Sequence, residues 1–194
     1  MALSHSALSS WPKGNVEGLF CGRNIMAFTF SADEIFQMAE QIERNGSKFY
    51  RHAADRARDG GLRQRLLKLA DWELKHEQRF RELHAELTPK DREPTTYDPE
   101  GQAGLFLQAM ADGHVFNVNE DPTQVLSGQE TMPALLKIAL GLEKDSIVFY
   151  LGMKKMIVPP AEREAEDQMD GIIHEEMTHI GMLNTELRGL GKPA

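Results

Sequence analysis

The chain repeats itself once, and this internal repeat limits the folds that it can adopt. A shift of the 194-residue sequence by 100 positions places residues 35–50 on residues 135–150. A shift by 103 positions places residues 69–80 on residues 172–183, and apolar positions coincide in both alignments. We therefore expect two similar halves with the same polar positions. The polar residues that coincide are Glu43 with Glu143, Tyr50 with Tyr150, Glu73 with Glu176 and His76 with His179.

The apolar pattern of each half predicts a pair of helices. Ile35, Ala39 and Ile42 begin a stripe with alternating steps of four and three residues, which is the spacing of one helix face. Ser31 and Glu34 have the spacing of a capping box at the start of this stripe. Good helix formers dominate the composition, so the expected fold class is all-α. The expected helices cover residues 31–58, 62–87, 131–157 and 160–189.

The connections between these helices predict a ferritin-like four-helix bundle built from two helical hairpins. The loops inside each half are short, whereas residues 89–130 lose the helical rhythm and form a crossover long enough to pass along the whole bundle. Short loop, long crossover, short loop is the connectivity of ferritin-type bundles. The bundle is expected over residues 31–190. Residues 1–30 are predicted to be an N-terminal tail, and we hypothesise that translation begins at Met26.

Composition and charge exclude several classes of function. With 22 basic and 30 acidic residues, the formal charge of −8 argues against a nucleic-acid partner, whose phosphates require clustered Lys and Arg. Cys21 is the single cysteine, so an internal disulfide and a four-thiolate metal site are both excluded. No apolar stretch approaches the ~20 residues that cross a bilayer, and residues 1–20 lack the pattern of an export signal. We therefore expect a cytoplasmic protein that does not bind a membrane.

The repeated polar residues predict a site for two metal ions. In each half, a Glu and a His three residues apart point from the same helix face. A further Glu lies on the apolar stripe of the preceding helix, where an unpaired carboxylate is costly to bury unless it is protonated or bound to a cation. Four carboxylates and two neutral imidazoles balance two divalent ions, and these donors suit iron or manganese and tolerate zinc. The six candidate ligands are Glu43, Glu73, His76, Glu143, Glu176 and His179.

Simpler explanations compete with parts of this pattern. A single Glu-x-x-His sequence is usually a solvated pair on a helix surface, so the second copy carries the metal prediction. Glu175 competes with Glu176 because it is also one helical turn from His179, and only the repeat alignment favours Glu176. Tyr50 and Tyr150 are expected to donate hydrogen bonds behind the ligands, or else to be core residues whose hydroxyls bind any acceptor. The histidines without a counterpart, predicted to be surface or packing residues, are His5, His52, His84 and His114.

The paired helices resemble those of the rubrerythrin-like branch of the ferritin-like superfamily. The resemblance lies in IERNGSKFY with WELKHEQRF and in LEKDSIVFY with HEEMTHIGML, within residues 31–188. It implies two iron ions held by the six candidate ligands, with Tyr50 and Tyr150 behind them. The four-cysteine rubredoxin module of rubrerythrins is missing from this sequence, so the resemblance implies an external electron donor such as a rubredoxin-like protein. Ser146 stands where rubrerythrins carry a further Glu.

The resemblance implies a non-haem di-iron oxidoreductase that reduces hydrogen peroxide or dioxygen. One alternative is a ferroxidase or iron-handling protein that binds Fe(II) transiently and passes Fe(III) on. Another is a non-catalytic helical partner protein whose metals only stabilise the fold. By analogy with other ferritin-like bundles, a homodimer or larger homo-oligomer is expected.

Overall fold

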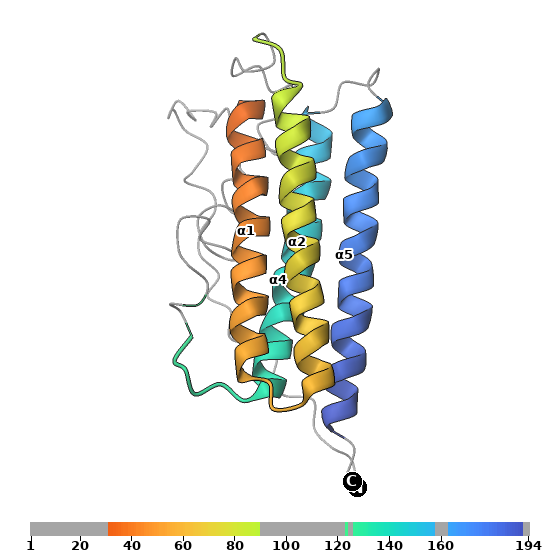
Figure 1. Cartoon of the computed structure of the whole chain (residues 1–194). Helices are drawn as coiled ribbons and strands as arrows, with labels where there is room; N and C mark the ends of the chain where they lie inside the picture. The colour runs from red at the N-terminus through yellow and green to blue at the C-terminus, as the bar shows by residue number, and fades with distance from the viewer. Residues whose placement is uncertain (1–30, 90–122, 124–125, 158–162, 192–194) are drawn as a thin grey trace, which may run out of the picture.

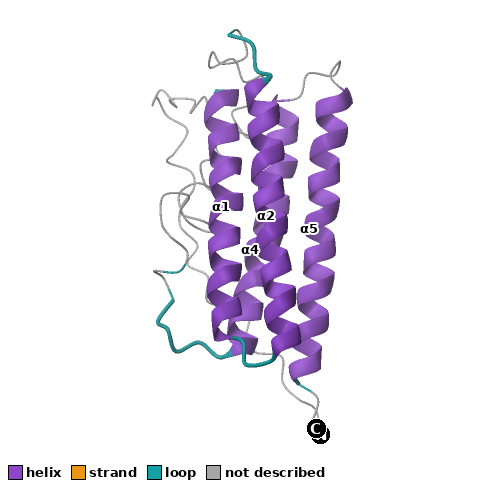
Figure 2. Cartoon of the chain, in the orientation of Figure 1, coloured by secondary structure: helices purple, strands orange, loops and turns teal. Residues whose placement is uncertain are grey.

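Four long helices make up most of the residues that the computed structural model describes, which are residues 31–89, 123, 126–157 and 163–191. All four are drawn in purple in Figure 2, and these residues contain no strand. The all-α class predicted from the sequence is therefore confirmed. The helices are α1 (Ala32–Arg56), α2 (Gly60–Ala85), α4 (Met132–Ile157) and α5 (Arg163–Leu190).

Side-chain caps fix where the first two helices begin. The Ser31 hydroxyl accepts a hydrogen bond from the Glu34 amide at 3.2 Å, and the Glu34 carboxylate accepts one from the Ser31 amide at 2.9 Å. This is the predicted capping box. The sequence prediction for α2 was wrong by two residues, because Asp59 caps this helix and Gly60 is already helical. The Asp59 carboxylate accepts a hydrogen bond from the Leu62 amide at 2.6 Å, which satisfies an amide that has no partner within the helix.

The helices form two antiparallel hairpins that pack side by side. The first hairpin is α1 with α2 and the second is α4 with α5, while α1 also contacts α4 and α2 contacts α5. Figure 1 shows that α2 ends at the top of the bundle and that α4 begins at the bottom. This is the ferritin-type arrangement, because the chain must pass from one end of the bundle to the other between the hairpins. Most of the predicted crossover (residues 89–130) and the predicted tail (residues 1–30) lie outside the described residues.

The core of the bundle consists of two apolar clusters separated by a polar layer. One cluster includes Phe36, Phe80 and Met153, and the other includes Phe49 and Leu66. On each helix, the predicted metal ligands fall between the residues of one cluster and those of the other. Apolar side chains therefore exclude water from both ends of the polar layer.

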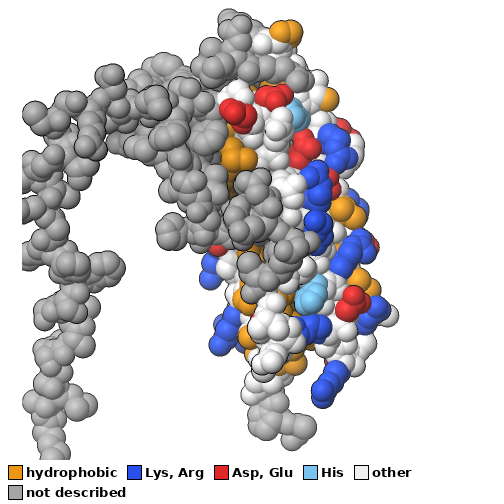
Figure 3. Space-filling view, turned by 90° about the vertical axis from the view of Figure 1, so that its left-hand side faces the viewer, with side chains coloured by type: hydrophobic (Ala, Val, Ile, Leu, Met, Phe, Trp, Pro, Cys, Tyr) orange, Lys and Arg blue, Asp and Glu red, His pale blue; other side chains and the backbone are white. Residues whose placement is uncertain are grey.

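The outer surface carries charged side chains that are largely paired. Arg44 binds Glu77 at 2.8 Å and Arg51 binds Asp71 at 3.0 Å. Figure 3 shows Lys and Arg side chains spread along the length of the described helices, with Asp and Glu side chains among them. Within the described ranges, none of the helices contains an apolar segment of the length that crosses a membrane.

Candidate metal centre

The fold brings all six predicted ligands together in the polar layer. Helix α1 provides Glu43 and α4 provides Glu143, while α2 and α5 each provide a Glu and a His one turn apart. Their exposed fractions lie between 0% and 4%. Burial of four carboxyl groups and two imidazoles in one layer is costly unless protons or cations compensate for their charge.

Two overlapping groups of ligand atoms fill this layer. In each group, one atom from every residue lies within 4.8 Å of the others. Glu73 and Glu176 belong to both groups, so each can hold two ions at once, whereas the other four residues belong to one group. The groups are Glu43, Glu73, His76 and Glu176, and Glu73, Glu143, Glu176 and His179.

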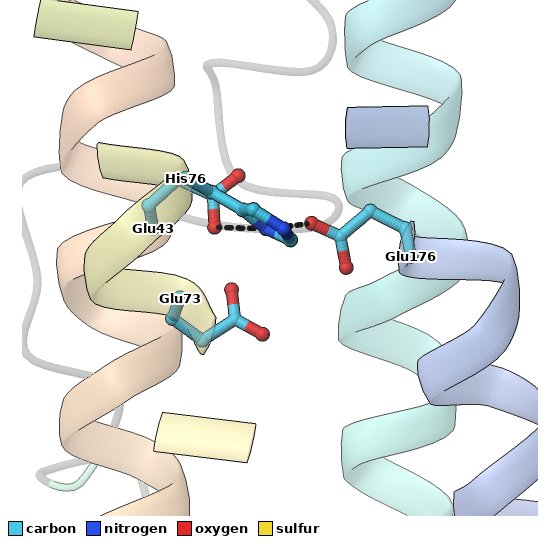
Figure 4. Close-up of side chains that lie close together, drawn as sticks. All are labelled: Glu43, Glu73, His76 and Glu176. Carbon is cyan, nitrogen blue, oxygen red and sulfur yellow. Dashed lines mark ion pairs between the residues drawn. The ribbon is translucent and has the colours of Figure 1, made fainter. Parts of the chain in front are cut away.

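Both histidines turn the same ring nitrogen towards the carboxylates. His76 Nδ1 lies 2.8 Å from Glu176 Oε1 and 3.6 Å from Glu43 Oε2, as Figure 4 shows. His179 Nδ1 lies 3.0 Å from Glu176 Oε2 and 3.4 Å from Glu73 Oε1. An imidazole nitrogen aimed at a group of carboxylate oxygens is the arrangement that a shared metal ion requires.

Several buried atoms of the layer lack a hydrogen-bond partner. Although His76 Nδ1 and Glu176 Oε1 are close, their geometry does not form a hydrogen bond, and both are unsatisfied. Glu43 Oε2 and Glu73 Oε1 are unsatisfied as well. An unsatisfied buried polar atom costs about 1–3 kcal/mol. These four atoms point to metal ions as their partners, and a set of carboxylate and imidazole donors fits iron or manganese.

In the absence of metal ions, protons stabilise the cluster. Burial and the charge of Glu176 raise the pKa of Glu73 and of Glu143 well above the usual range of a carboxyl group. Burial opposes the charged form of His76, but the carboxylates of Glu176 and Glu43 outweigh it and raise the pKa of His76 to about 11.

The pKa of the second histidine is raised in the same way, whereas the pKa of the other shared carboxylate, Glu176, is lowered. At His179, burial again favours the neutral ring, but Glu143 and Glu176 raise its pKa to about 9. At Glu176, burial favours the protonated form, yet its close polar contacts with Glu143, His179 and His76 lower its pKa below the usual value. In the metal-free layer, two protonated imidazoles therefore flank the ionised carboxylate of Glu176.

The two predicted tyrosines bind the carboxylates of the opposite hairpin. Tyr150 on α4 donates a hydrogen bond to Glu43 Oε1 on α1 at 2.6 Å. Tyr50 on α1 donates a hydrogen bond to Glu143 Oε1 on α4. Both tyrosines are buried, and burial together with these carboxylates raises the pKa of each phenol well above its usual value. Each phenol therefore keeps its proton and holds one carboxylate in place.

Two further residues contact the histidines. Glu175 was considered only as an alternative ligand to Glu176, and Trp72 was given no role from the sequence. Glu175 Oε2 lies 2.9 Å from His76 Nε2, on the side of the ring that faces away from the carboxylate group. The Trp72 ring stacks on the His179 ring, with centroids 5.1 Å apart. A signal was present in the sequence, since both residues directly precede a shared Glu and coincide at the 103-residue shift.

The other histidines lie away from the centre where the structure describes them. His84 is half-buried between Asp33 and Glu40, at 2.9 Å and 2.7 Å, and stacks on Phe36. His52 is also half-buried. Both agree with the prediction of surface or packing residues. His5 and His114 lie outside the described residues.

Comparison with known proteins agrees with this geometry. The family model described as Rubrerythrin matches residues 34–187. The chain belongs to the rubrerythrin family. The crystal structure of a ferritin-like diiron-carboxylate protein from Thermotoga maritima matches with a TM-score of 0.62 and 23% sequence identity, over 82% of this chain and 96% of that chain. At this identity the match supports the ferritin-like fold. A search of curated proteins found no match.

Membership of the rubrerythrin family agrees with a buried Glu and His cluster that is able to bind metal. Ser146, which occupies the position of a further Glu in the rubrerythrin pattern, is buried on α4. Its hydroxyl donates a hydrogen bond to the Leu142 carbonyl oxygen of its own helix at 3.1 Å. Ser146 therefore does not supply a fifth carboxylate to this centre.

Proposed function

We propose that this protein is a non-haem di-iron oxidoreductase that reduces hydrogen peroxide or dioxygen with electrons from an external donor. The observation that carries the proposal is the pair of four-residue groups with two shared carboxylates and four unsatisfied buried atoms. Membership of the rubrerythrin family supports iron as the metal, with manganese or zinc as substitutes. Iron supplies the electrons of the reaction when it is bound.

The ligand residues of the centre have different roles in holding two ions. Glu73 and Glu176 are placed to bridge, because their oxygen atoms belong to both groups. Glu43 and Glu143 each serve one ion, and the phenol of the opposite hairpin orients each of them. The hydrogen bonds from the two phenols fix these carboxylates before metal binds, which lowers the free-energy cost of assembling the site.

The surroundings of the centre suit a reaction with a small oxidant. Apolar residues lie on both sides of the polar layer, so bulk water is excluded and only small molecules are expected to reach it. Within the described part of the chain, no cysteine is available to carry electrons. A separate electron carrier, such as a rubredoxin-like protein, is therefore part of the proposal, as is a homodimer or larger homo-oligomer.

Metal analysis tests the first part of the proposal. Protein purified without oxygen and loaded with Fe(II) is expected to hold two iron ions per chain. The double variant Glu43→Ala with Glu143→Ala removes one carboxylate from each group and should lose most of this iron while it keeps its helix content by circular dichroism. Equal iron in wild type and variant would contradict the proposed centre.

Rapid mixing of the di-ferrous protein with peroxide or with dioxygen tests the reaction. Oxidation of both ions, followed by return to the ferrous state when a reductant is added, is the expected result. Iron that stays bound over repeated cycles supports the reductase. Iron that leaves after oxidation, while further Fe(II) is consumed without a reductant, supports the ferroxidase alternative. Ser146, which leaves the centre without a fifth carboxylate, is the observation that favours this alternative.

A further inference from the structure

The two histidines of the centre are supported in different ways, although they occupy equivalent positions in the repeat. Each is contacted by the residue that directly precedes the shared Glu of the opposite hairpin. For His76 this residue is Glu175, and for His179 it is Trp72. The repeat thus places a carboxylate behind one histidine and an indole behind the other.

The contact with Glu175 determines how His76 presents its nitrogen atoms. His76 Nε2 lies 2.9 Å from Glu175 Oε2, and the other oxygen of Glu175 accepts a hydrogen bond from Arg79 at 3.0 Å. The carboxylate therefore accepts the Nε2 proton and leaves Nδ1 directed at Glu43 and Glu176. Such an outer carboxylate fixes the ring orientation and makes the ligating nitrogen a better donor.

The contact with Trp72 gives His179 a different kind of support. The indole and imidazole rings are stacked at an interplanar angle of 20°. On its other side, the His179 ring stacks on His76, with centroids 5.5 Å apart. Stacking holds the plane of the ring but offers no acceptor for the Nε2 proton. The carboxylates that lie close to His179 in the described structure all face its Nδ1 atom: Glu176 at 3.0 Å, Glu73 at 3.4 Å and Glu143 at 3.6 Å.

We propose that the two ion positions are inequivalent, and that the position served by His76 fills first because Glu175 orients this histidine from the opposite hairpin. Glu175 is a positioning residue, since it acts on the metal through His76. The inference rests on the proposed metal centre and goes beyond it, because the shared ligands alone would predict two similar positions. Loss of an outer partner typically weakens metal binding about 10- to 100-fold.

A titration of the metal-free chain with Mn(II) tests this inference. The EPR signal of free Mn(II) gives the unbound ion, and the bound ion follows by difference. Mn(II) is the weakest binder of the divalent series, which brings the stepwise dissociation constants into a measurable range. The wild type is expected to bind two ions in separate steps. Glu175→Gln keeps the shape of the side chain but removes its charge, and should weaken the tighter step about 10-fold without changing the weaker step.

Two further variants separate positioning from a general structural effect. Arg79→Gln removes the other partner of Glu175 but leaves its carboxylate on His76, so both steps should stay close to wild type. Trp72→Glu places a carboxylate behind His179, and should tighten the weaker step. If Glu175→Gln weakens both binding steps equally, or leaves the ratio of the two dissociation constants unchanged, the inference is wrong although the centre binds metal. If the wild type binds no Mn(II) and no Fe(II), the proposed function itself fails.

Discussion

The two hairpins agree in the residues that face the ions and differ in the residues behind them. Both provide a Glu on the first helix, a Glu and a His on the second, and a tyrosine that reaches the opposite hairpin. Behind these residues, the hairpins place Trp72 and Glu175 at equivalent positions. In the proposed metal centre, the residues placed to hold the ions are therefore symmetric between the hairpins, while the residues behind them differ.

A second difference concerns the space beside the shared carboxylates. Gly46 on α1 is the equivalent of Ser146 on α4. A Cβ atom at Gly46 would lie 3.0 Å from Glu73 Oε2, so α1 approaches this carboxylate more closely than a side chain would permit. The first hairpin therefore confines its shared Glu, whereas the second carries a side chain at the matching position.

The largest effect is expected from variants that distinguish shared ligands from unshared ones. Glu176→Ala removes a member of both groups and should abolish binding of both ions, whereas Glu43→Ala should abolish binding of one. Glu176→Ala also leaves two protonated histidines without their common counter-ion, which should destabilise the metal-free fold by about 3–5 kcal/mol. Metal content per chain and urea unfolding measure the two effects. One ion retained by Glu176→Ala would show that the groups are independent.

The protons of the metal-free centre predict how its stability depends on pH. His76 and His179 have pKa values of about 11 and about 9 in the fold, against about 6.5 when unfolded. Between about pH 6.5 and 9, the folded chain therefore holds more protons than the unfolded chain, and stability falls as the pH rises. The slope is at most about 1.4 kcal/mol per pH unit for each such proton.

Thermal unfolding of the metal-free protein between pH 6.5 and 9 measures this dependence. Metal binding displaces the same protons, so the midpoint of the metal-loaded protein should change less, and metal uptake should acidify a weakly buffered solution. His76→Gln and His179→Gln compare the hairpins, and each should reduce the slope. A midpoint of the metal-free protein that rises over this range would contradict the proton distribution.

A smaller effect, similar in both hairpins, is expected from Tyr50 and Tyr150, each of which binds a carboxylate of the opposite hairpin. Tyr50→Phe and Tyr150→Phe each remove one buried hydrogen bond to a carboxylate, at a cost of about 1–3 kcal/mol in the free energy of unfolding. Equal losses of unfolding free energy in the two variants would show that the two hydrogen bonds contribute equally to stability. Urea unfolding of both variants, with the metal removed by a chelator, makes the comparison. No loss in either variant would mean that the phenols are packing residues only.

The smallest effect is expected at the glycine beside Glu73. An alanine within a helix is more stable than a glycine by about 0.5–1 kcal/mol, and Gly141 on α4 has open space around its Cβ position. Gly141→Ala should therefore stabilise the protein by this amount and leave metal binding unchanged. Gly46→Ala should gain less stability and weaken metal binding, because Glu73 must move to admit the methyl group. If the two variants change stability and metal binding equally, Gly46 does not confine Glu73.

The residues that meet in the polar layer were predictable from the sequence because the repeat marks them in matching pairs. Ser31 and Glu34 likewise predicted the start of α1 from a local pattern, and α1 begins there. The repeat aligns Trp72 with Glu175, but it does not give their contacts, because these residues act across the hairpins and their contacts depend on how the helices are rotated. The partners of the tyrosines escaped prediction for the same reason, since the pattern gives spacing along one helix and not the identity of its neighbour.

Each four-residue group takes its ligands from three helices and from both hairpins. Either hairpin alone would offer three of the four residues of one group and one of the four residues of the other, so the extent of metal loading measures how well the two hairpins are docked. By mass action, ions that bind the docked state oppose its separation. Removal of metal by a chelator should therefore weaken the contacts between the two hairpins first. Amide hydrogen exchange should rise in the helices along this interface before it rises at the turn within either hairpin.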